Sequence, residues 1–217
     1  MVDKNTSIPN ATLKRLPMYL RFLQDKRSEG VMNISSVTIA DHFKFNSVQV
    51  KKDIALVSSV GGKPNVGFDL KTLIRDLENF LGCNSSQKAC LVGVGKLGSA
   101  LLSYKGFENY GLDVIAGFDV NPVLYGKTIN GTTIYPMDEL TSFVKANNVY
   151  MAIVAVQAKD AQTVCDQLVK SGILAIMNFA PERLSVPDGV VVQTVDIAAS
   201  LAILSTKLKV ILDKRDN

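Results

Sequence analysis

The segment that most constrains the fold is CLVGVGKLGS, residues 90–99. In it Gly93, Gly95 and Gly98 follow an apolar predicted strand and open a predicted helix. In a dinucleotide-binding turn such glycines allow a tight turn, close approach of a pyrophosphate and close helix packing. Free N–H groups at the start of the helix would attract the phosphates. The spacing predicts a dinucleotide site, with glycines that serve only as turns as the alternative.

A carboxylate follows where such a site needs one. Asp119 ends the next predicted strand, 21 residues after Gly98, where it would accept hydrogen bonds from both ribose hydroxyls. The same charge would repel the extra phosphate of NADP, and no arginine follows Asp119 to neutralise that phosphate. The sequence therefore favours NADH and NAD+ as cofactors.

The chain after residue 88 alternates between two patterns. Short β-branched runs are typical of buried parallel strands, and helical patterns separate several of them. The runs are KACLVGV, DVIAGFD, VYMAIVAV, GILAIMNFA and GVVVQTV. The helical patterns include MDELTSFVKA and KDAQTVCDQLVK. This alternation predicts an α/β fold, a Rossmann-type doubly wound parallel sheet.

The chain before the polar stretch LGCNSSQK (81–88) has a different organisation. Ser7 can cap a first helix, along which leucines recur at intervals of three and four from Leu13 to Leu23. Two shorter helices are predicted over residues 36–43 and 47–57. GGKPNVGFDL (61–70) then has the glycines, proline and alternation of a hairpin wing. This order predicts an N-terminal winged helix-turn-helix, whose third helix enters the DNA major groove.

Polar and basic side chains gather on that third helix. Its first two turns carry Ser47, Gln49, Lys51 and Lys52, and Lys63 lies at the predicted wing tip. Residues 1–82 hold 12 Lys and Arg against 8 Asp and Glu, while the rest of the chain is neutral. A basic module beside a neutral one indicates a polyanionic partner, here DNA. A solvated helix face with two lysines is the alternative.

The residues do not suggest catalysis. None of the six tyrosines has a lysine four residues later, as a short-chain dehydrogenase would need. The single histidine, His42, lies in the predicted DNA-binding part, and Arg183 has no partner base. We therefore expect no enzymatic activity and assign no catalytic residue. A NAD-dependent oxidoreductase with a basic appendage stays as the rival interpretation.

The C-terminal segment DIAASLAILSTKLKVILDKRDN predicts a terminal helix. Its apolar residues are spaced 4, 3, 4 and 3, a heptad-like stripe. They are Ile197, Leu201, Leu204, Leu208 and Ile211. Such a stripe packs either on its own sheet or on a second copy. The second option would give the two-fold dimer that reads a palindrome.

Cysteine use and the N-terminus add two expectations. Cys83, Cys90 and Cys165 form no CxxC pair, which argues against a disulfide framework or a metal site. They are more simply read as small core residues than as a thiol redox sensor. No apolar run approaches the roughly 20 residues of a membrane span, and no signal-peptide core is present. A cytoplasmic protein is expected.

Together these pieces resemble the Rex family of redox-sensing transcriptional repressors. The resemblance runs from RLPMYLRFL (15–23) to the terminal helix. It is carried most specifically by QVKKD, GGKPNVGF, GVGKLGSALLSYKGF, GFDVNP, NFAP and VDIAASL. It implies a homodimer with domain-swapped terminal helices that binds palindromic operator DNA, senses the NADH/NAD+ ratio and releases the DNA when NADH binds. It also implies three parts: a winged-helix domain (1–82), a Rossmann domain (83–195) and a dimerisation helix (196–217).

The resemblance also implies residue roles. Cofactor contacts would come from Gly93, Val94, Gly95, Lys96, Leu97, Gly98, Tyr104, Asp119, Val156, Asn178 and Asp196. DNA contacts would come from Arg15, Ser47, Gln49, Lys51, Lys52 and Lys63. Asp196 would meet the nicotinamide bound to the partner subunit. Asp196 would pair with Tyr104 in one state of the protein and with Arg21 in the other. That exchange would couple cofactor to DNA.

Several residues depart from the family pattern. Lysine stands at position 51 where arginine is frequent, and it cannot make the same bidentate guanine contact. Leu56, Val57 and Ser58 replace aromatic residues and a glycine, Ile197 replaces an aromatic residue, and Gln157 replaces a proline. A paralogue with altered or lost sensing, or a NAD-binding scaffold without DNA recognition, would also carry such changes.

Overall fold

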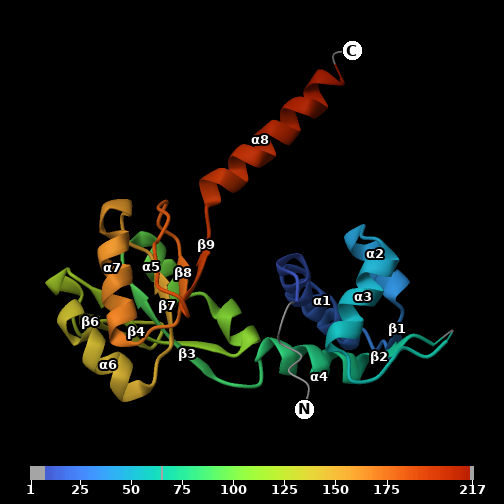
Figure 1. Ribbon diagram of the computed structural model, residues 1–217, viewed down its shortest axis with the longest axis horizontal. Coiled ribbons are helices and arrows are strands. Elements are labelled where there is room, and N and C mark those ends of the chain that lie inside the picture. The colour runs from blue at the N-terminus through green and yellow to red at the C-terminus, as the bar shows by residue number, and fades with distance from the viewer. Residues whose placement is uncertain (1–7, 65, 216–217) are drawn as a thin grey trace. The chain divides into compact units, whose positions relative to one another are not determined.

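The structure is a computed structural model and describes residues 8–64 and 66–215. Contacts divide the chain into two compact units, shown in Figure 1. The first contains residues up to 85 together with 109–111, and the second contains 86–108 and the chain from 112 onward. The expected division between residues 82 and 83 lies close to this boundary, but the return of 109–111 to the first unit was not predicted. Among the described helices, none is long and apolar enough to cross a membrane.

The first unit is a winged helix. Its elements are α1 (Asn10–Ser28), β1 (Asn33–Ile34), α2 (Ser36–Phe43), α3 (Ser47–Val57), β2 (Phe68–Asp69) and α4 (Leu70–Leu81). β1 pairs antiparallel with β2, and a bridge between Lys63 and Gly67 closes the wing. The predicted bounds of α2 and α3 are confirmed. Ser7 lies outside the described residues, and Pro9 occupies the N-cap position of α1.

Side-chain caps explain where the helices of this unit begin. The Ser35 hydroxyl accepts from the Thr38 N–H at 3.0 Å, and the Asn46 carbonyl accepts from the Val48 N–H at 2.8 Å. Asp69 caps α4 in the same way through Thr72. α4 was not predicted, although its buried residues Leu70, Leu73, Ile74 and Leu77 have helical spacing. This helix completes the core of the unit.

The second unit is built on a seven-stranded sheet in the order β5-β6-β4-β3-β7-β8-β9. Its strands are β3 (Gln87–Val92), β4 (Leu112–Asp119), β5 (Thr128–Ile129), β6 (Thr132–Pro136), β7 (Met151–Val154), β8 (Ala175–Asn178) and β9 (Val191–Thr194). All neighbours are parallel except β5 and β6. The short β5 and β6 were not predicted, because their threonine-rich residues form no apolar run. The α/β, Rossmann-type prediction is confirmed.

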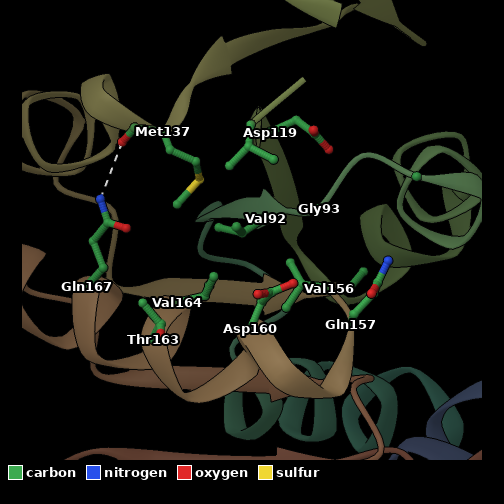
Figure 2. A pocket seen from close by; sticks show the side chains of 13 residues that line it. Val92, Gly93, Asp119, Met137, Val156, Gln157, Asp160, Thr163, Val164 and Gln167 are labelled. Atoms are coloured by element: carbon green, nitrogen blue, oxygen red, sulfur yellow. Dashed lines mark hydrogen bonds between the residues drawn. The ribbon is translucent and has the colours of Figure 1, made fainter. Parts of the chain in front are cut away.

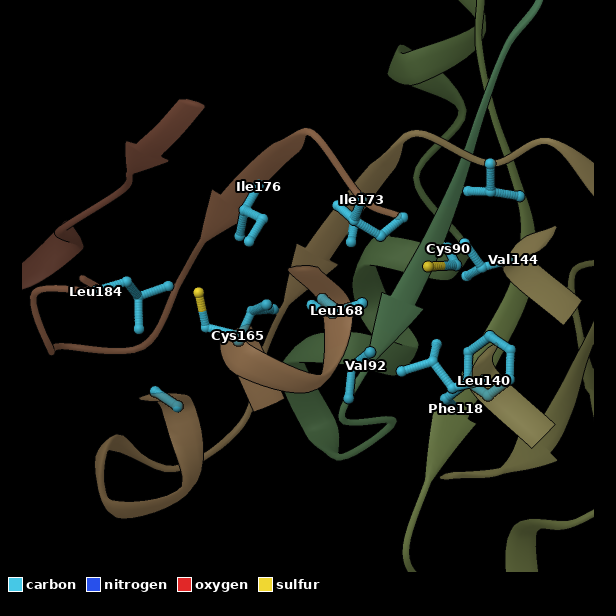
Figure 3. Packing of buried hydrophobic residues seen from close by; sticks show 14 of the residues in the cluster. Cys90, Val92, Phe118, Leu140, Val144, Cys165, Leu168, Ile173, Ile176 and Leu184 are labelled. Atoms are coloured by element: carbon cyan, nitrogen blue, oxygen red, sulfur yellow. The ribbon is translucent and has the colours of Figure 1, made fainter. Parts of the chain in front are cut away.

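Helices and short 3-10 turns connect the strands. They are α5 (Lys96–Leu102), η1 (Lys105–Tyr110), η2 (Pro122–Leu124), η3 (Met137–Glu139), α6 (Leu140–Asn147) and α7 (Ala158–Ser171). A further helix, α8 (Ile197–Asp213), follows the last strand, β9. On one face of the sheet Cys90 and Val92 of β3 pack with Phe118, Leu140 of α6 and Leu168 of α7 (Figure 3). On the other face Leu91 packs with Leu102 of α5. The alternation along β3 therefore buries both faces of the sheet.

Candidate functional site

Each glycine of the loop after β3 has a distinct structural reason. Gly93 has φ +94°, and an added Cβ there would lie 2.7 Å from the Ala155 carbonyl oxygen. A Cβ at Gly98 would collide with the carbonyl of Gly93, so α5 packs on the loop only because that residue is glycine. A Cβ at Gly95 would meet nothing within 4 Å. Gly95 therefore faces open space, where a ligand can approach the backbone.

Asp119 holds this loop from the end of β4. Its Oδ2 accepts a hydrogen bond from the Val94 N–H at 2.6 Å, and its Oδ1 accepts one from the Asn121 N–H at 2.8 Å. Each carboxylate oxygen has further lone pairs, so the group can also accept from a ligand hydroxyl. A fixed negative charge therefore lies beside the glycine loop.

A pocket of about 450 Å³ opens at this edge of the sheet (Figure 2). It lies where β3 is flanked by β4 and β7, the point at which the strand order reverses direction and ligands bind in open α/β sheets. It is lined by Val92, Gly93, Gly95, Asp119, Val120, Met137, Ala155, Val156, Gln157, Asp160, Thr163, Val164 and Gln167. Four predicted cofactor residues, Gly93, Gly95, Asp119 and Val156, thus share one pocket.

Sequence reasoning missed the contribution of α7 to this pocket. Asp160, Thr163, Val164 and Gln167 line it and recur at helical spacing, so they form one face of α7. The helical spacing of these residues is visible in the segment KDAQTVCDQLVK. However, the polar residues on that face match no known ligand-binding motif. Met137, which begins η3, completes the same wall.

Other predicted cofactor residues lie outside the pocket lining. Lys96 and Leu97 are exposed in the first turn of α5, and Tyr104 follows α5 with its ring 5.2 Å from that of Phe107. Asn178 is fully buried: its Nδ2 donates to the Ala180 and Glu182 carbonyls, and its Oδ1 accepts from the Ala180 N–H. Its amide therefore holds the loop after β8 instead of facing the pocket.

The basic side chains of the first unit form a candidate DNA interface. Lys51 and Lys52 of α3 and Lys63 of the wing are exposed. Lys51 and Lys63 line one groove of about 480 Å³, whose remaining lining is Ser35, Ser36, Gly62, Pro64, Val66, Gly67 and Phe68. Ser47 is the first residue of α3. Two lysines that the sequence separates by 12 positions are thus brought to a single groove.

Two predicted DNA contacts are already engaged within the protein. Arg15 donates from Nε to Asp53 Oδ2 at 2.7 Å and from Nη2 to Asp53 Oδ1 at 2.9 Å. Gln49 donates from Nε2 to the same Oδ1 at 3.0 Å. Arg15 therefore joins α1 to α3 through Asp53, and Gln49 contacts the same carboxylate from within α3. The sequence did not predict either role.

The terminal helix α8 buries none of its side chains. The exposed fraction of the side chains in the predicted stripe ranges from 51% at Ile211 to 66% at Leu201. Ile203 and Val210 on another side of the helix are also more than half exposed. Asp196 caps α8, with its Oδ1 accepting from the Ala199 N–H at 2.8 Å. Packing of this stripe on the chain's own sheet is therefore contradicted by the structure.

Arg21 lies exposed on α1 in the first unit, whereas Tyr104 and Asp196 belong to the second. Their coupling stays a prediction.

The cysteines are better explained as core residues than as a thiol redox sensor. Burial raises the pKa of the Cys90 thiol to about 12 and also raises the pKa of Cys165. Thiolate reactivity at these two positions is correspondingly suppressed.

Two family descriptions match the chain. Residues 84–182 match "CoA binding domain" and residues 7–55 match "Putative DNA-binding protein N-terminus". The first covers the glycine loop and the pocket strands β3, β4 and β7. The second covers α1 and α2 and most of α3. The two descriptions therefore follow the two units.

Relatives match over nearly the whole chain. A redox-sensing transcriptional repressor Rex of Bacteroides fragilis is 37% identical over 204 residues, 94% of this chain and 92% of its own. That of Carboxydothermus hydrogenoformans is 39% identical over 206 residues, 95% of this chain and 99% of its own. The crystal structure of RSP in complex with beta-NAD+ and operator DNA has a TM-score of 0.89 at 30% identity and covers 97% of both chains. RSP in complex with beta-NADH has a TM-score of 0.86 at 30% identity, covering 98% of this chain and 100% of that one.

A winged helix with an exposed basic groove, joined to a Rossmann sheet with a glycine-lined pocket, defines a class of DNA-binding proteins that carry a dinucleotide-type domain. Within that class the relatives are specific. The chain belongs to the Rex family of redox-sensing transcriptional repressors.

Proposed function

We propose that this protein is a redox-sensing repressor that binds NADH or NAD+ in the pocket and palindromic operator DNA through α3 and the wing. The observation that carries the proposal is the pairing, in one chain, of the Gly95–Asp119 pocket with the Lys51–Lys63 groove. RSP, which this chain resembles over its whole length, has been solved with NAD+ and operator DNA and with NADH. NADH would favour release from DNA.

The pocket supports a dinucleotide without a phosphate on its adenosine ribose. The pyrophosphate would lie against Gly95 and the start of α5, and the ribose hydroxyls would donate to Asp119. NADP and coenzyme A both carry a phosphate on this ribose, which the Asp119 carboxylate would repel. NADH and NAD+ are therefore the proposed ligands, even though the matched family is described as a CoA binding domain.

The exposed α8 supports a homodimer. Helices that are apolar on more than one side are normally buried, and α8 exposes Leu204 and Leu208 on one side and Ile203 and Val210 on another. Burying each large apolar side chain contributes about 1.5–3 kcal/mol. Exchange of α8 between two subunits would cover both sides at once, so we propose a domain-swapped dimer.

Cofactor sensing would act by shifting populations between a DNA-binding and a closed dimer. The reduced nicotinamide is neutral and the oxidised one positive, so the charge around the nicotinamide determines which form binds more tightly. A complete switch needs roughly 5.5 kcal/mol of differential affinity. One buried apolar ring contributes only about 1.5–3 kcal/mol. Two sites per dimer and a rearranged network of Tyr104, Asp196 and Arg21 would supply the rest.

On the DNA side, Lys51, Lys52, Lys63 and Ser47 are the proposed contacts. Arg15 would act indirectly, by holding α3 against α1 through Asp53, while Gln49 orients the same carboxylate from within α3. The proposal assigns no catalytic step: His42 stacks on Phe22 of α1 with ring centroids 4.1 Å apart, far along the chain from the glycine loop.

A repressor acts where the chromosome lies, which in bacteria such as those of the relatives is the cytoplasm.

The test is selection of bound oligonucleotides from a random pool, with and without NADH. The proposal predicts enrichment of an inverted repeat without NADH and loss of that enrichment with NADH. Failure to enrich any repeat would contradict DNA recognition. Steady oxidation of NADH with small ketones would instead support an oxidoreductase.

A further inference from the structure

The pocket continues beyond the glycine loop and Asp119. Under the proposed function, the pyrophosphate lies at Gly95 and the ribose at Asp119, so the base of the adenosine half must occupy the remaining part. That part is walled by Met137, Thr163, Val164 and Gln167. At 1.5 Å rise per residue, Gln167 lies about 10 Å further along α7 than Asp160.

Met137 and Val164 give this far end two apolar walls, and the Gln167 amide is oriented there by the protein itself. Gln167 Nε2 donates a long hydrogen bond of 3.5 Å to the carbonyl oxygen of Met137. Figure 2 shows the amide nitrogen turned toward Met137 and the amide oxygen turned toward the pocket. The side chain is half-buried between these neighbours. The far end therefore presents a hydrogen-bond acceptor to the base.

We propose that Gln167 Oε1 accepts a hydrogen bond from the exocyclic amino group of adenine and thereby determines which base the pocket takes. Adenine carries an N–H donor at position 6, whereas hypoxanthine and guanine carry an oxygen acceptor there. With an oxo base two acceptors face each other, and both lose hydrogen bonds they could make to water. Met137 and Val164 would flank the ring. This inference rests on the proposed dinucleotide pocket.

A comparison of two reduced dinucleotides tests the proposal directly. The probes are NADH and its deamino analogue, nicotinamide hypoxanthine dinucleotide in reduced form. In the analogue an oxygen replaces the amino group at position 6 of the purine, and the adjacent N1 carries a hydrogen. Both fluoresce through the nicotinamide, and the chain contains no tryptophan to interfere. We expect the intact protein to bind NADH about tenfold more tightly, the effect of leaving one polar pair unmade at a partly open site.

Variants of Gln167 test whether this residue causes the preference for NADH over the deamino analogue. Gln167→Leu removes the acceptor. In this variant the dissociation constants for the deamino analogue and for NADH should become equal, so that their ratio falls to about one. Gln167→Glu supplies an acceptor without an N–H donor, and the preference for NADH is retained. The matched control is Gln157→Leu, the same change at the other end of the same pocket. It alters the affinity for both dinucleotides but leaves their ratio unchanged.

The outcomes separate this inference from the function on which it rests. Equal affinities for the two probes in the intact protein, or an unchanged preference in Gln167→Leu, would overturn the reading of adenine by Gln167 while leaving NADH binding intact. Loss of the ratio in Gln157→Leu would also overturn it, since the discrimination would then not be local. No binding of either dinucleotide would overturn the proposed function itself, and the inference with it.

Discussion

Arg15 and Asp53 join α1 to α3 through two parallel hydrogen bonds of 2.7 and 2.9 Å. Asp53 is 1% exposed and also accepts from Thr12, Tyr19 and Gln49. Every donor except Gln49 lies on α1, so one buried carboxylate fixes how α3 is rotated against α1. Under the proposed function, the direction in which Lys51 and Lys52 face DNA depends on this cluster.

Asp53→Asn should therefore destabilise the winged-helix unit. Removing one charge of a buried pair leaves Arg15 without its counter-ion, which costs about 3–5 kcal/mol in the free energy of unfolding. The measurement is urea unfolding followed by circular dichroism. The control is Glu29→Gln, which breaks the exposed pair with Lys26 and should cost less than about 1 kcal/mol. Similar losses in both variants would refute the role of burial.

The same cluster predicts a pH dependence. Burial raises the pKa of Asp53, but the hydrogen bonds from Arg15, Gln49, Tyr19 and Thr12 outweigh it and hold the pKa below its ordinary value. The contribution to stability is therefore complete above the unfolded-state pKa of about 3.9 and is lost as the pH falls through the folded-state value. Unfolding free energies of the intact protein and of Asp53→Asn should converge below about pH 4. A constant difference between pH 7 and pH 3 would argue against this assignment.

Leu204→Asp should weaken the proposed dimer. A leucine at the centre of the α8 stripe contributes about 1.5–3 kcal/mol when buried, and the dimer contains it twice. The dimer dissociation constant should rise by roughly 10²- to 10⁴-fold, measured by sedimentation velocity. Lys209→Asp places the same residue on the polar side of α8 and should leave the dimer intact. A monomeric unsubstituted protein at micromolar concentration would exclude the dimer altogether.

Lys52→Ala should weaken binding to all DNA sequences by a similar factor. If Lys52 contacts a phosphate, its removal reduces the slope of log affinity against log salt by about one unit per protomer. Fluorescence anisotropy at several salt concentrations measures that slope. Lys145→Ala, an exposed lysine of α6 in the other unit, is the control and should leave the slope unchanged. An unaltered slope in Lys52→Ala would place this lysine away from the phosphates.

Much of the fold could be predicted from local patterns, because α2, α3 and the glycine loop each carry a cap or a motif within a few residues. α4 was not predicted, although Asp69 caps its start and Gly82 follows its end. The ion pair of Arg15 with Asp53 joins residues 38 positions apart, and no local pattern indicates it.

In the site too, residues within local motifs could be predicted and residues placed by tertiary packing could not. Gly93 and Asp119 follow from motif spacing, whereas Gln167 enters the pocket only because α7 packs beside β7 and η3 supplies a carbonyl. The buried role of Asn178 depends on how the loop after β8 folds back on it. Such contacts arise from tertiary packing, which residue spacing alone does not encode.

The most direct test of the central claim is the affinity for an inverted-repeat operator, measured by fluorescence anisotropy with saturating NADH, with saturating NAD+ and without cofactor. The account predicts that NADH raises the operator dissociation constant at least tenfold, the equivalent of about 1.4 kcal/mol of coupling, and that NAD+ does not. An operator affinity that NADH leaves unchanged, while nicotinamide fluorescence shows the pocket to be filled, would contradict it.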